Sequence, residues 1–316
     1  QVQVGAFAPG AWQARPRQKP GCASAHTGEM GNCPCQSPHL LQLEVTESKT
    51  EHPSVGSREE TIKDPSLSSS KLRVLITGAS GNLGREVLKM FTCSSYEVRG
   101  LSTRPRPGPF KVCDLTKDDD VREEVMGFGP HLVLHLAAER RPDVVAKDPE
   151  RAYHLNVVST ATLSEVCRAT GSRLVFISTD YVFDGSAPPY SVDAIRNPLS
   201  DYGKQKVEGE KLVLRDPSLA TVLRIPLLYG HVDRLEDSPV TDLYAKLIKP
   251  GLSKMDDRQK RYPTYTRDVA RVLRKMIDAR QQGAHIDGIF HWQGSECLTK
   301  YNIIHIMSDI TGVDVS

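Results

Sequence analysis

The feature that most constrains this chain is a glycine-rich turn between an apolar strand and an amphipathic helix. Residues 72–77 (LRVLIT) form a short, β-branched apolar run that is typical of a buried strand. Residues 82–91 then place their large apolar side chains on one helical face. The turn between them, residues 78–84 (GASGNLG), has the spacing G-x-x-G-x-x-G. We therefore predict a strand–turn–helix unit at this point of the chain.

Glycines at these positions let the backbone turn tightly and approach a pyrophosphate at the N-terminus of the helix, where free N–H groups favour negative charge. The turn is accordingly a candidate dinucleotide-binding site, and a turn that serves packing alone is the alternative. The predicted cofactor-binding residues of the turn are Gly78, Ser80, Gly81, Asn82, Leu83 and Gly84.

Apolar runs and helical patterns alternate along the chain beyond this unit. Further strands are expected at residues 96–101, 110–113, 131–136, 173–178, 220–224 and 289–292, and helices at 116–128, 149–170, 200–215, 266–280 and 299–312. Strands that alternate with helices at this spacing indicate a parallel sheet covered on both faces. The predicted fold class is α/β, a doubly wound parallel sheet of the Rossmann type with a smaller, truncated C-terminal lobe.

The first 70 residues differ in composition from the rest of the chain. They hold seven Pro, six Gly and nine Ser, and Phe7 and Trp12 are their only Phe, Trp or Tyr residues. Such a segment buries too little apolar surface to offset its ordering entropy. We predict a disordered leader at 1–70, a cofactor-binding domain at 71–225 and a partial substrate or partner lobe at 226–316.

Charge and cysteine usage exclude several classes of protein. The 41 Lys and Arg nearly balance the 39 Asp and Glu, which argues against a nucleic-acid partner. No apolar run is long enough to span a membrane. Seven cysteines without regular spacing predict an intracellular, cytoplasmic protein with reduced thiols, and the nucleus and the mitochondrion remain open alternatives. Cys22, His26, Cys33, Cys35 and His39 lack paired C-x-x-C spacing, so we predict no metal site.

The segment after the second expected strand indicates which dinucleotide is bound. An NAD-binding chain usually has an acid there to hold the ribose 2′-hydroxyl. Residues 100–106 (GLSTRPR) instead contain Arg104 and Arg106 and no acid. Because a guanidinium suits a 2′-phosphate, the segment favours NADP over NAD, with solvated loop charges as the alternative. Asp114 and Leu115 follow the third expected strand and are placed at the adenine edge.

Tyr202 and Lys206 have the spacing Y-x-x-x-K on an expected helix. Residues four apart share a helical face, so the Lys206 ammonium is expected to lower the pKa of Tyr202 and make it a usable acid for a carbonyl oxygen. Thr179 ends the preceding strand and could hydrogen-bond the same substrate oxygen. The alternative is an exposed helix face without a catalytic role. If the protein is a reductase, its catalytic residues are Thr179, Tyr202 and Lys206.

With these motifs the chain resembles the extended short-chain dehydrogenase/reductases over residues 71–316. Residues 178–185 (STDYVFDG) and 202–204 (YGK) are similar to the dTDP-4-dehydrorhamnose reductase group. The chain more closely resembles one branch of that group, the regulatory β subunits of methionine adenosyltransferase. The strings that carry this resemblance are 137–145 (AAERRPDVV), 223–230 (LRIPLLYG), 261–264 (RYPT), 290–292 (FHW) and 299–301 (TKY).

The resemblance implies an NADP-binding fold whose partner is the catalytic subunit of methionine adenosyltransferase. It places the cofactor phosphates at the glycine turn. It implies that the 2′-phosphate lies near Ser102, Thr103 and Arg104, with further cofactor contacts from Asp114, Leu115, Leu136, Arg140, Tyr202, Lys206 and Leu228.

Three functions follow as alternatives. The first is a non-catalytic regulatory subunit that binds NADP and modulates S-adenosylmethionine synthesis by its partner. The second is an NADPH-dependent reductase of a 4-keto nucleotide sugar. The third is a cofactor-sensing module that NADP merely stabilises. The presence of Thr179, Tyr202 and Lys206 does not distinguish among these three functions, because Tyr202 and Lys206 would also hold the nicotinamide ribose of a bound cofactor.

Overall fold

The computed structural model describes residues 71–93, 95–249, 251 and 254–315. The predicted leader at 1–70, with its five candidate metal ligands, lies outside these residues and stays a prediction. The described part contains no group of His, Cys, Asp and Glu side chains that could hold a metal ion. No helix among the described residues is both long and apolar enough to cross a membrane.

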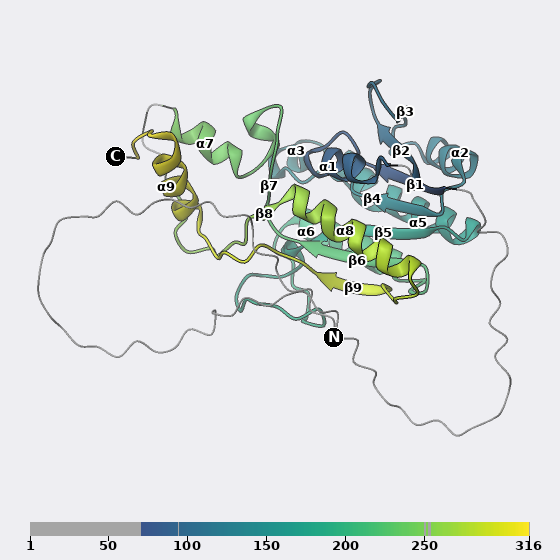
Figure 1. The fold of residues 1–316 in the computed structure, drawn as a ribbon. Coiled ribbons are helices and arrows are strands. Elements are labelled where there is room, and N and C mark those ends of the chain that lie inside the picture. Colours follow the sequence, from purple (N-terminus) through teal and green to yellow (C-terminus); the bar gives the residue numbers. More distant parts are fainter. Residues whose placement is uncertain (1–70, 94, 250, 252–253, 316) are drawn as a thin grey trace, which may run out of the picture.

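Seven parallel strands form one sheet in the order β3-β2-β1-β4-β5-β6-β9, which confirms the predicted fold class (Figure 1). The strands are β1 (Leu72–Thr77), β2 (Tyr96–Ser102), β3 (Phe110–Val112), β4 (Leu132–His135), β5 (Arg173–Thr179), β6 (Ala220–Ile225) and β9 (Gly288–His291). The strand order reverses between β1 and β4. In open α/β sheets, ligands bind at this point, outside the carboxyl ends of the strands.

Helices cover both faces of the sheet. They are α1 (Asn82–Phe91), α2 (Asp118–Phe128), α3 (Pro142–Lys147), α4 (Pro149–Tyr153), α5 (Ser159–Thr170), α6 (Asp201–Val213), α7 (Thr241–Leu247), α8 (Thr266–Gln281) and α9 (Lys300–Thr311). The helix predicted at 149–170 is interrupted by a π-helical segment, His154–Val158, between α4 and α5. A π-helical turn inserts a residue into the helical ladder, which apolar periodicity does not reveal.

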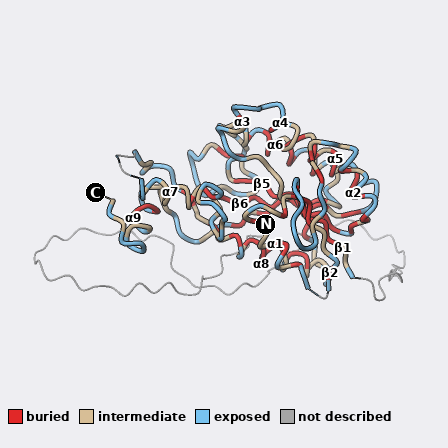
Figure 2. The backbone as a smooth tube through the Cα atoms, turned by 90° about the horizontal axis from the view of Figure 1, so that it is seen from above, coloured by how far each residue is buried: buried red, intermediate tan, exposed pale blue. Residues whose placement is uncertain are grey.

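Two apolar cores lie on opposite faces of the sheet because successive strand side chains alternate in direction. On one face, Val74 and Ile76 of β1 pack with helices α1 and α8. On the other face, Leu75 packs with helices α2, α5 and α6. Figure 2 shows these buried segments as a red centre enclosed by paler helices. The three-layer arrangement leaves the carboxyl ends of the strands as the place for a ligand.

The seventh strand and helix α8 come from beyond residue 225. Strand β9 pairs with β6, and α8 packs against α1. The sheet therefore includes residues from beyond the boundary predicted at 225, because the chain comes back after residue 287 and adds β9 beside β6. What remains is a smaller unit with the short strands β7 (Leu228–Tyr229) and β8 (Thr264–Tyr265).

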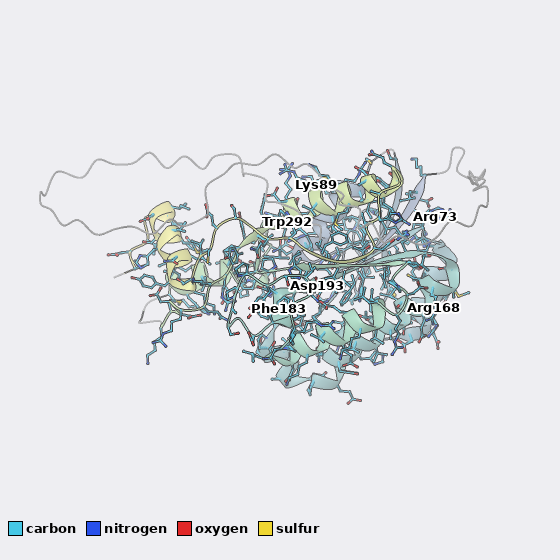
Figure 3. The ribbon with its side chains drawn as sticks, turned by 90° about the horizontal axis from the view of Figure 1, so that it is seen from below. Arg73, Lys89, Arg168, Phe183, Asp193 and Trp292 are labelled. Carbon is cyan, nitrogen blue, oxygen red and sulfur yellow. The ribbon has the colours of Figure 1, made fainter. Side chains whose placement is uncertain are left out.

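Helices α7 and α9 share a separate apolar cluster formed by Val240, Leu243, Ile303 and Ile304. Figure 1 shows these two helices beyond the end of the sheet at which β9 finishes. Figure 3 labels residues at both ends of the strands. Arg73 and Arg168 lie toward one end of the sheet, and Phe183 and Trp292 lie toward the other. Phe183 and Trp292 come shortly after β5 and β9, so they mark the carboxyl ends of the strands.

Candidate functional site

The glycine turn adopts a backbone that side chains would block. Gly78 has a φ of 63°, and the amide of Gly81 donates to the Gly78 carbonyl at 3.0 Å. A Cβ at Gly84 would lie 2.1 Å from that carbonyl oxygen, closer than any side chain can approach. Glycine is thus required at the first and last positions of the turn, as the spacing predicts.

The N-terminus of α1 suits a phosphate group. Its N-cap, Gly81, forms no side-chain cap hydrogen bond, and its first turn carries no acid. The side-chain oxygen of Asn82 is buried without a hydrogen-bond partner among the described residues. Exchanging the amide oxygen and nitrogen would present a donor at the same place. The free backbone N–H groups form a donor set that fits a dinucleotide pyrophosphate, and the Asn82 side chain adds a donor when its amide is exchanged.

A basic cavity of about 430 Å³ lies beside the turn. Three of its lining side chains are cationic, Arg85, Lys89 and Arg106, and Ser80 of the turn also lines it. No acid is among its lining residues, which include Leu88, Thr92, Pro107 and Phe110. A cavity with this charge fits a phosphate or a similar anion.

The residues expected at the 2′-phosphate form a tight loop after β2. Ser102 is buried, and its hydroxyl donates to the Arg104 carbonyl at 2.8 Å. The Arg104 amide donates back to that hydroxyl at 3.3 Å. Thr103 and the Arg104 side chain are exposed. The loop therefore holds Arg104 in place by its backbone and leaves its guanidinium in solvent.

The predicted adenine edge follows β3. Asp114 accepts hydrogen bonds from the amide and the hydroxyl of Thr116, at 3.0 and 2.8 Å. Burial opposes ionisation, but these two hydrogen bonds hold the pKa of Asp114 below its ordinary value. Leu115 beside it is buried. Asp114 is thus a fixed carboxylate that could accept hydrogen bonds from a ligand.

The remaining predicted contacts come from three different elements. Leu136 and Arg140 lie in the loop after β4, and the Leu136 amide donates to the Thr77 hydroxyl at 3.2 Å. Leu228 lies on β7 and Tyr202 on α6. Burial raises the pKa of the Tyr202 phenol, and the nearby charge of Arg140 partly opposes that rise. These residues therefore gather at the carboxyl end of the sheet, and their contact with a cofactor stays a prediction.

Lys206 does not acidify Tyr202 as the spacing predicts. Burial lowers the pKa of Lys206 to about 7, and its ammonium lies 4.0 Å from the centre of the Phe176 ring. Burial raises the pKa of Tyr202 well above its ordinary value, and the opposing charge is Arg140. The expected effect is wrong because helical spacing fixes a shared face but not the direction in which a long side chain settles.

The hydroxyl of Thr179 is engaged by its neighbours. It donates to the Asp180 carboxylate at 3.1 Å and accepts from the Tyr181 amide at 3.2 Å. Burial raises the pKa of Asp180 to about 6. The Arg261 guanidinium donates to the Tyr181 phenol at 3.0 Å, and the Tyr181 and Tyr202 rings meet edge to face. A polar cluster thus lies beside Thr179 and Tyr202, whereas Lys206 lies against the Phe176 ring.

Sequence reasoning missed Asp180 and Arg261 as members of this cluster. Asp180 directly follows Thr179 in the string that carries the family resemblance, so its position could have indicated a role. Arg261 lies far along the chain in a dense charge run, yet it is 9% exposed. Only the tertiary structure shows that this one charge of the run is buried.

A buried ion-pair network joins helix α6 to the sheet beneath it. The sequence did not indicate this network. Glu210 of α6 accepts two hydrogen bonds from Arg224 of β6, at 2.8 and 2.7 Å. Ser178 donates to Glu210 at 2.5 Å, and Arg196 donates to it at 3.1 Å. Burial opposes ionisation, but the two arginines and the serine hold the pKa of Glu210 below its ordinary value. The network ties α6, which carries Tyr202 and Lys206, to the sheet.

Replacing Lys206 with Met should stabilise the fold by about 1–3 kcal/mol at pH 6.5, because Met fills a similar volume without a charge to desolvate. The folded-state pKa is about 7 and the ordinary value is 10.5. Between these two pH values Lys206 is protonated in the unfolded state and largely neutral in the folded state, so the stability of the wild type rises with pH. The stability that Lys206→Met gains over the wild type should therefore be smaller at pH 9 than at pH 6.5.

Urea denaturation at both pH values measures this effect. Lys204→Met is the matched control, because Lys204 lies on the same helix, is exposed, and has Asp201 as its ion-pair partner among the described residues. Its effect should stay within about 0.5 kcal/mol. Destabilisation by Lys206→Met at both pH values would show that the ammonium is stabilised where it lies.

Comparison with known proteins gives three results. The family model for the RmlD substrate binding domain matches residues 72–315. A relative from Xenopus tropicalis, methionine adenosyltransferase 2 subunit beta, is 45% identical over 239 residues, which cover 75% of this chain and 71% of the relative. A dTDP-4-dehydrorhamnose reductase from Aggregatibacter actinomycetemcomitans is 32% identical over 233 residues, covering 73% of this chain and 76% of that protein.

A solved structure shares the fold. The crystal structure of a dTDP-4-dehydrorhamnose reductase from Clostridium acetobutylicum superposes with a TM-score of 0.68 and 30% identity, covering 78% of this chain and 82% of that one. The glycine turn and the set Thr179, Tyr202 and Lys206 therefore stand in a chain related to both groups. The chain belongs to the RmlD substrate binding domain family and, within it, to the methionine adenosyltransferase 2 subunit beta group.

Proposed function

We propose that this chain is a regulatory subunit of methionine adenosyltransferase that binds NADP and modulates S-adenosylmethionine synthesis by the catalytic subunit. The observation that carries the proposal is the contrast between the two halves of the site. The glycine turn leaves the backbone N–H groups at the start of α1 without a side-chain cap, and these are the donors that a dinucleotide needs. The tyrosine, by contrast, has a raised pKa, and the Thr179 hydroxyl is engaged by Asp180 and Tyr181. Binding without turnover fits both halves.

The similarity to named proteins supports the same choice. Identity is 45% to a methionine adenosyltransferase 2 subunit beta and 32% to a dTDP-4-dehydrorhamnose reductase, over similar lengths. A subunit so named assembles with a methionine adenosyltransferase. We infer that the partner of this chain is the catalytic subunit of that enzyme.

The dinucleotide we propose is NADP rather than NAD. The loop after β2 carries Arg104 and no acid, and three cationic side chains line the neighbouring cavity. NADPH should therefore bind at least tenfold more tightly than NADH, because a 2′-phosphate gains charge-assisted hydrogen bonds from arginine. Titration calorimetry with Arg104→Ala and Arg106→Ala, singly and together, should show the preference falling. Equal affinities of the wild type for both dinucleotides would contradict the assignment.

A kinetic assay tests the regulatory role. Adding this chain to the catalytic subunit should change the rate of S-adenosylmethionine formation, or its KM for methionine, by at least twofold. At saturating NADP, which offsets any loss of cofactor affinity, Tyr202→Phe should keep this effect, because the proposed role needs no proton from the phenol. If the rate and the KM for methionine of the catalytic subunit stay unchanged at saturating concentrations of this chain, the proposed regulatory role is wrong.

Reduction of a 4-keto nucleotide sugar is the second candidate. It is favoured by the presence of Thr179, Tyr202 and Lys206 together and by the 32% identical reductase. Oxidation of NADPH with a panel of 4-keto nucleotide sugars, abolished by Tyr202→Phe, would establish it. Stabilisation by NADP without turnover and without a partner would leave the third alternative, a cofactor-sensing module.

We also propose a reducing, cytoplasmic location. The four cysteines within the described residues, Cys93, Cys113, Cys167 and Cys297, are all free thiols. Two of them, Cys113 and Cys167, are buried, and burial raises the pKa of each thiol, to about 11 and about 12. Thiols with raised pKa values stay unreactive in such a compartment.

A further inference from the structure

The segment 228–238 lies at the point where the strand order reverses. It begins on β7 and ends before α7, and it includes the 3-10 helix Leu235–Asp237. Strands β1 and β4 are neighbours in the sheet, and the chain leaves them in the glycine turn and in the loop before α3. Figure 1 shows β7, α1 and α3 at the same end of the sheet. We call residues 228–238 the strap.

The strap is held on two sides of the crevice between the carboxyl ends of β1 and β4. On the β1 side, helix α1 holds it. Arg85, one turn into α1, forms an ion pair with Asp233. The same guanidinium donates to the His231 carbonyl at 3.2 Å. Arg85 also lines the basic cavity beside the turn. The strap is therefore fastened directly beside the proposed phosphate-binding helix.

The opposite side holds the strap through the loop after β4. Arg140 in that loop donates to the carbonyl of Asp237. Ser238 is fully buried, and its hydroxyl donates to the Leu228 carbonyl at 2.9 Å, which closes the strap at its base. Because the two tethers come from the chain after β1 and the chain after β4, the strap crosses the crevice between these strands.

The first part of the strap lies against the glycine turn. A Cβ at Gly230 would lie 2.1 Å from the Thr266 hydroxyl and 3.4 Å from the Asn82 side-chain oxygen. Both oxygens are buried and have no hydrogen-bond partner among the described residues. Gly230 thus allows the strap to lie within contact distance of Asn82, which we expect at the cofactor phosphates. A larger residue at Gly230 would push the strap away.

From these contacts we propose that the strap closes over the pyrophosphate of the bound nicotinamide dinucleotide and slows its release. The inference rests on the proposed dinucleotide binding. The Arg85–Asp233 ion pair and the Arg140–Asp237 hydrogen bond fasten the strap on the two sides of the crevice. The ligand leaves when the strap lifts, so the tethers set the dissociation rate.

The test is the dissociation rate of NADPH, measured by stopped-flow fluorescence with excess NADP as competitor. Asp233→Ala should speed dissociation three- to fivefold, as expected for the loss of one partly exposed ion pair. Glu236→Ala is the matched control: Glu236 lies in the same strap, is exposed, and its ion-pair partner among the described residues is Arg234. Its dissociation rate should match that of the wild type, and both variants should melt at the wild-type temperature.

A second pair of variants tests the strap independently of charge. Gly230→Ala should speed dissociation at least tenfold, because the new Cβ would meet the Thr266 hydroxyl. Adding Thr266→Ala removes that oxygen and should restore the rate toward that of the wild type. Failure of the wild type to bind NADPH would overturn the proposed dinucleotide binding and the strap with it. Binding by the wild type with unchanged dissociation in Asp233→Ala and Gly230→Ala would overturn the strap alone.

Discussion

Replacing Arg224 with Met is expected to lower the free energy of unfolding by about 3–5 kcal/mol at pH 8, because it leaves the Glu210 carboxylate buried without its main partner. Glu210 has no exposed surface and Arg224 is 3% exposed. Two hydrogen bonds, at 2.8 and 2.7 Å, join them. Urea denaturation followed by circular dichroism measures the loss.

The same substitution should cost less in acid. Hydrogen bonds and charges from Arg224, Ser178 and Arg196 outweigh burial and hold the folded-state pKa of Glu210 below its ordinary value. The wild type therefore loses this stabilisation as the pH falls through that pKa. In the variant the unpaired carboxyl takes up a proton at higher pH, so the difference between the two proteins should narrow by pH 5.

Arg122→Met provides the control for removal of an arginine. Arg122 pairs with Glu165 at 2.8 Å, and both side chains are largely exposed, at 42% and 51%. The change should cost far less than Arg224→Met, because solvent screens an exposed pair. A cost for Arg224→Met no larger than that for Arg122→Met would mean that the network does not hold α6 to the sheet.

Gly84→Ala is expected to weaken NADPH binding at least 100-fold, about 2.7 kcal/mol. The new Cβ would lie 2.1 Å from the Gly78 carbonyl oxygen and 2.7 Å from the Ala79 Cα, both of them backbone atoms. The turn must open to admit it, which displaces the N–H groups proposed to bind the pyrophosphate. Fluorescence titration with NADPH measures the affinity, and circular dichroism verifies the fold.

Substitutions at two further glycines serve as comparisons for the expected loss of NADPH affinity. At Gly81 the nearest atom to a Cβ is the Gly78 carbonyl oxygen at 3.3 Å, so Gly81→Ala should weaken binding far less than Gly84→Ala and leave the fold intact. At Gly127, exposed on α2, a Cβ meets nothing within 4 Å. Gly127→Ala should leave binding unchanged and stabilise the protein by about 0.5–1 kcal/mol. Equal NADPH affinity in Gly84→Ala and the wild type would remove the turn from the binding site.

The sequence was most informative where a short segment determines its own structure. Strand β1 and helix α1 begin and end at the predicted residues, because an apolar run, a glycine turn and an amphipathic face define them locally. Helices α3 and α7, of six and seven residues, carry too few turns to show a periodicity and were not predicted. Their positions depend on the packing of the surrounding chain.

The candidate site divides in the same way. The glycine turn could be predicted because its residues are adjacent and each meets a local backbone requirement. The environment of Lys206 could not, because Phe176, whose ring it contacts, lies thirty residues earlier on β5. Likewise Glu210 and Arg224 look like an ordinary helix acid and a strand arginine until α6 packs on the sheet. Electrostatics of this kind depends on tertiary contacts.

Sedimentation velocity tests the proposed partnership most directly. The chain is mixed with the catalytic subunit of methionine adenosyltransferase at micromolar concentration, with and without NADP. We expect a new, faster-sedimenting species that contains both proteins. Separate boundaries for the two proteins at every ratio, in both conditions, would contradict it.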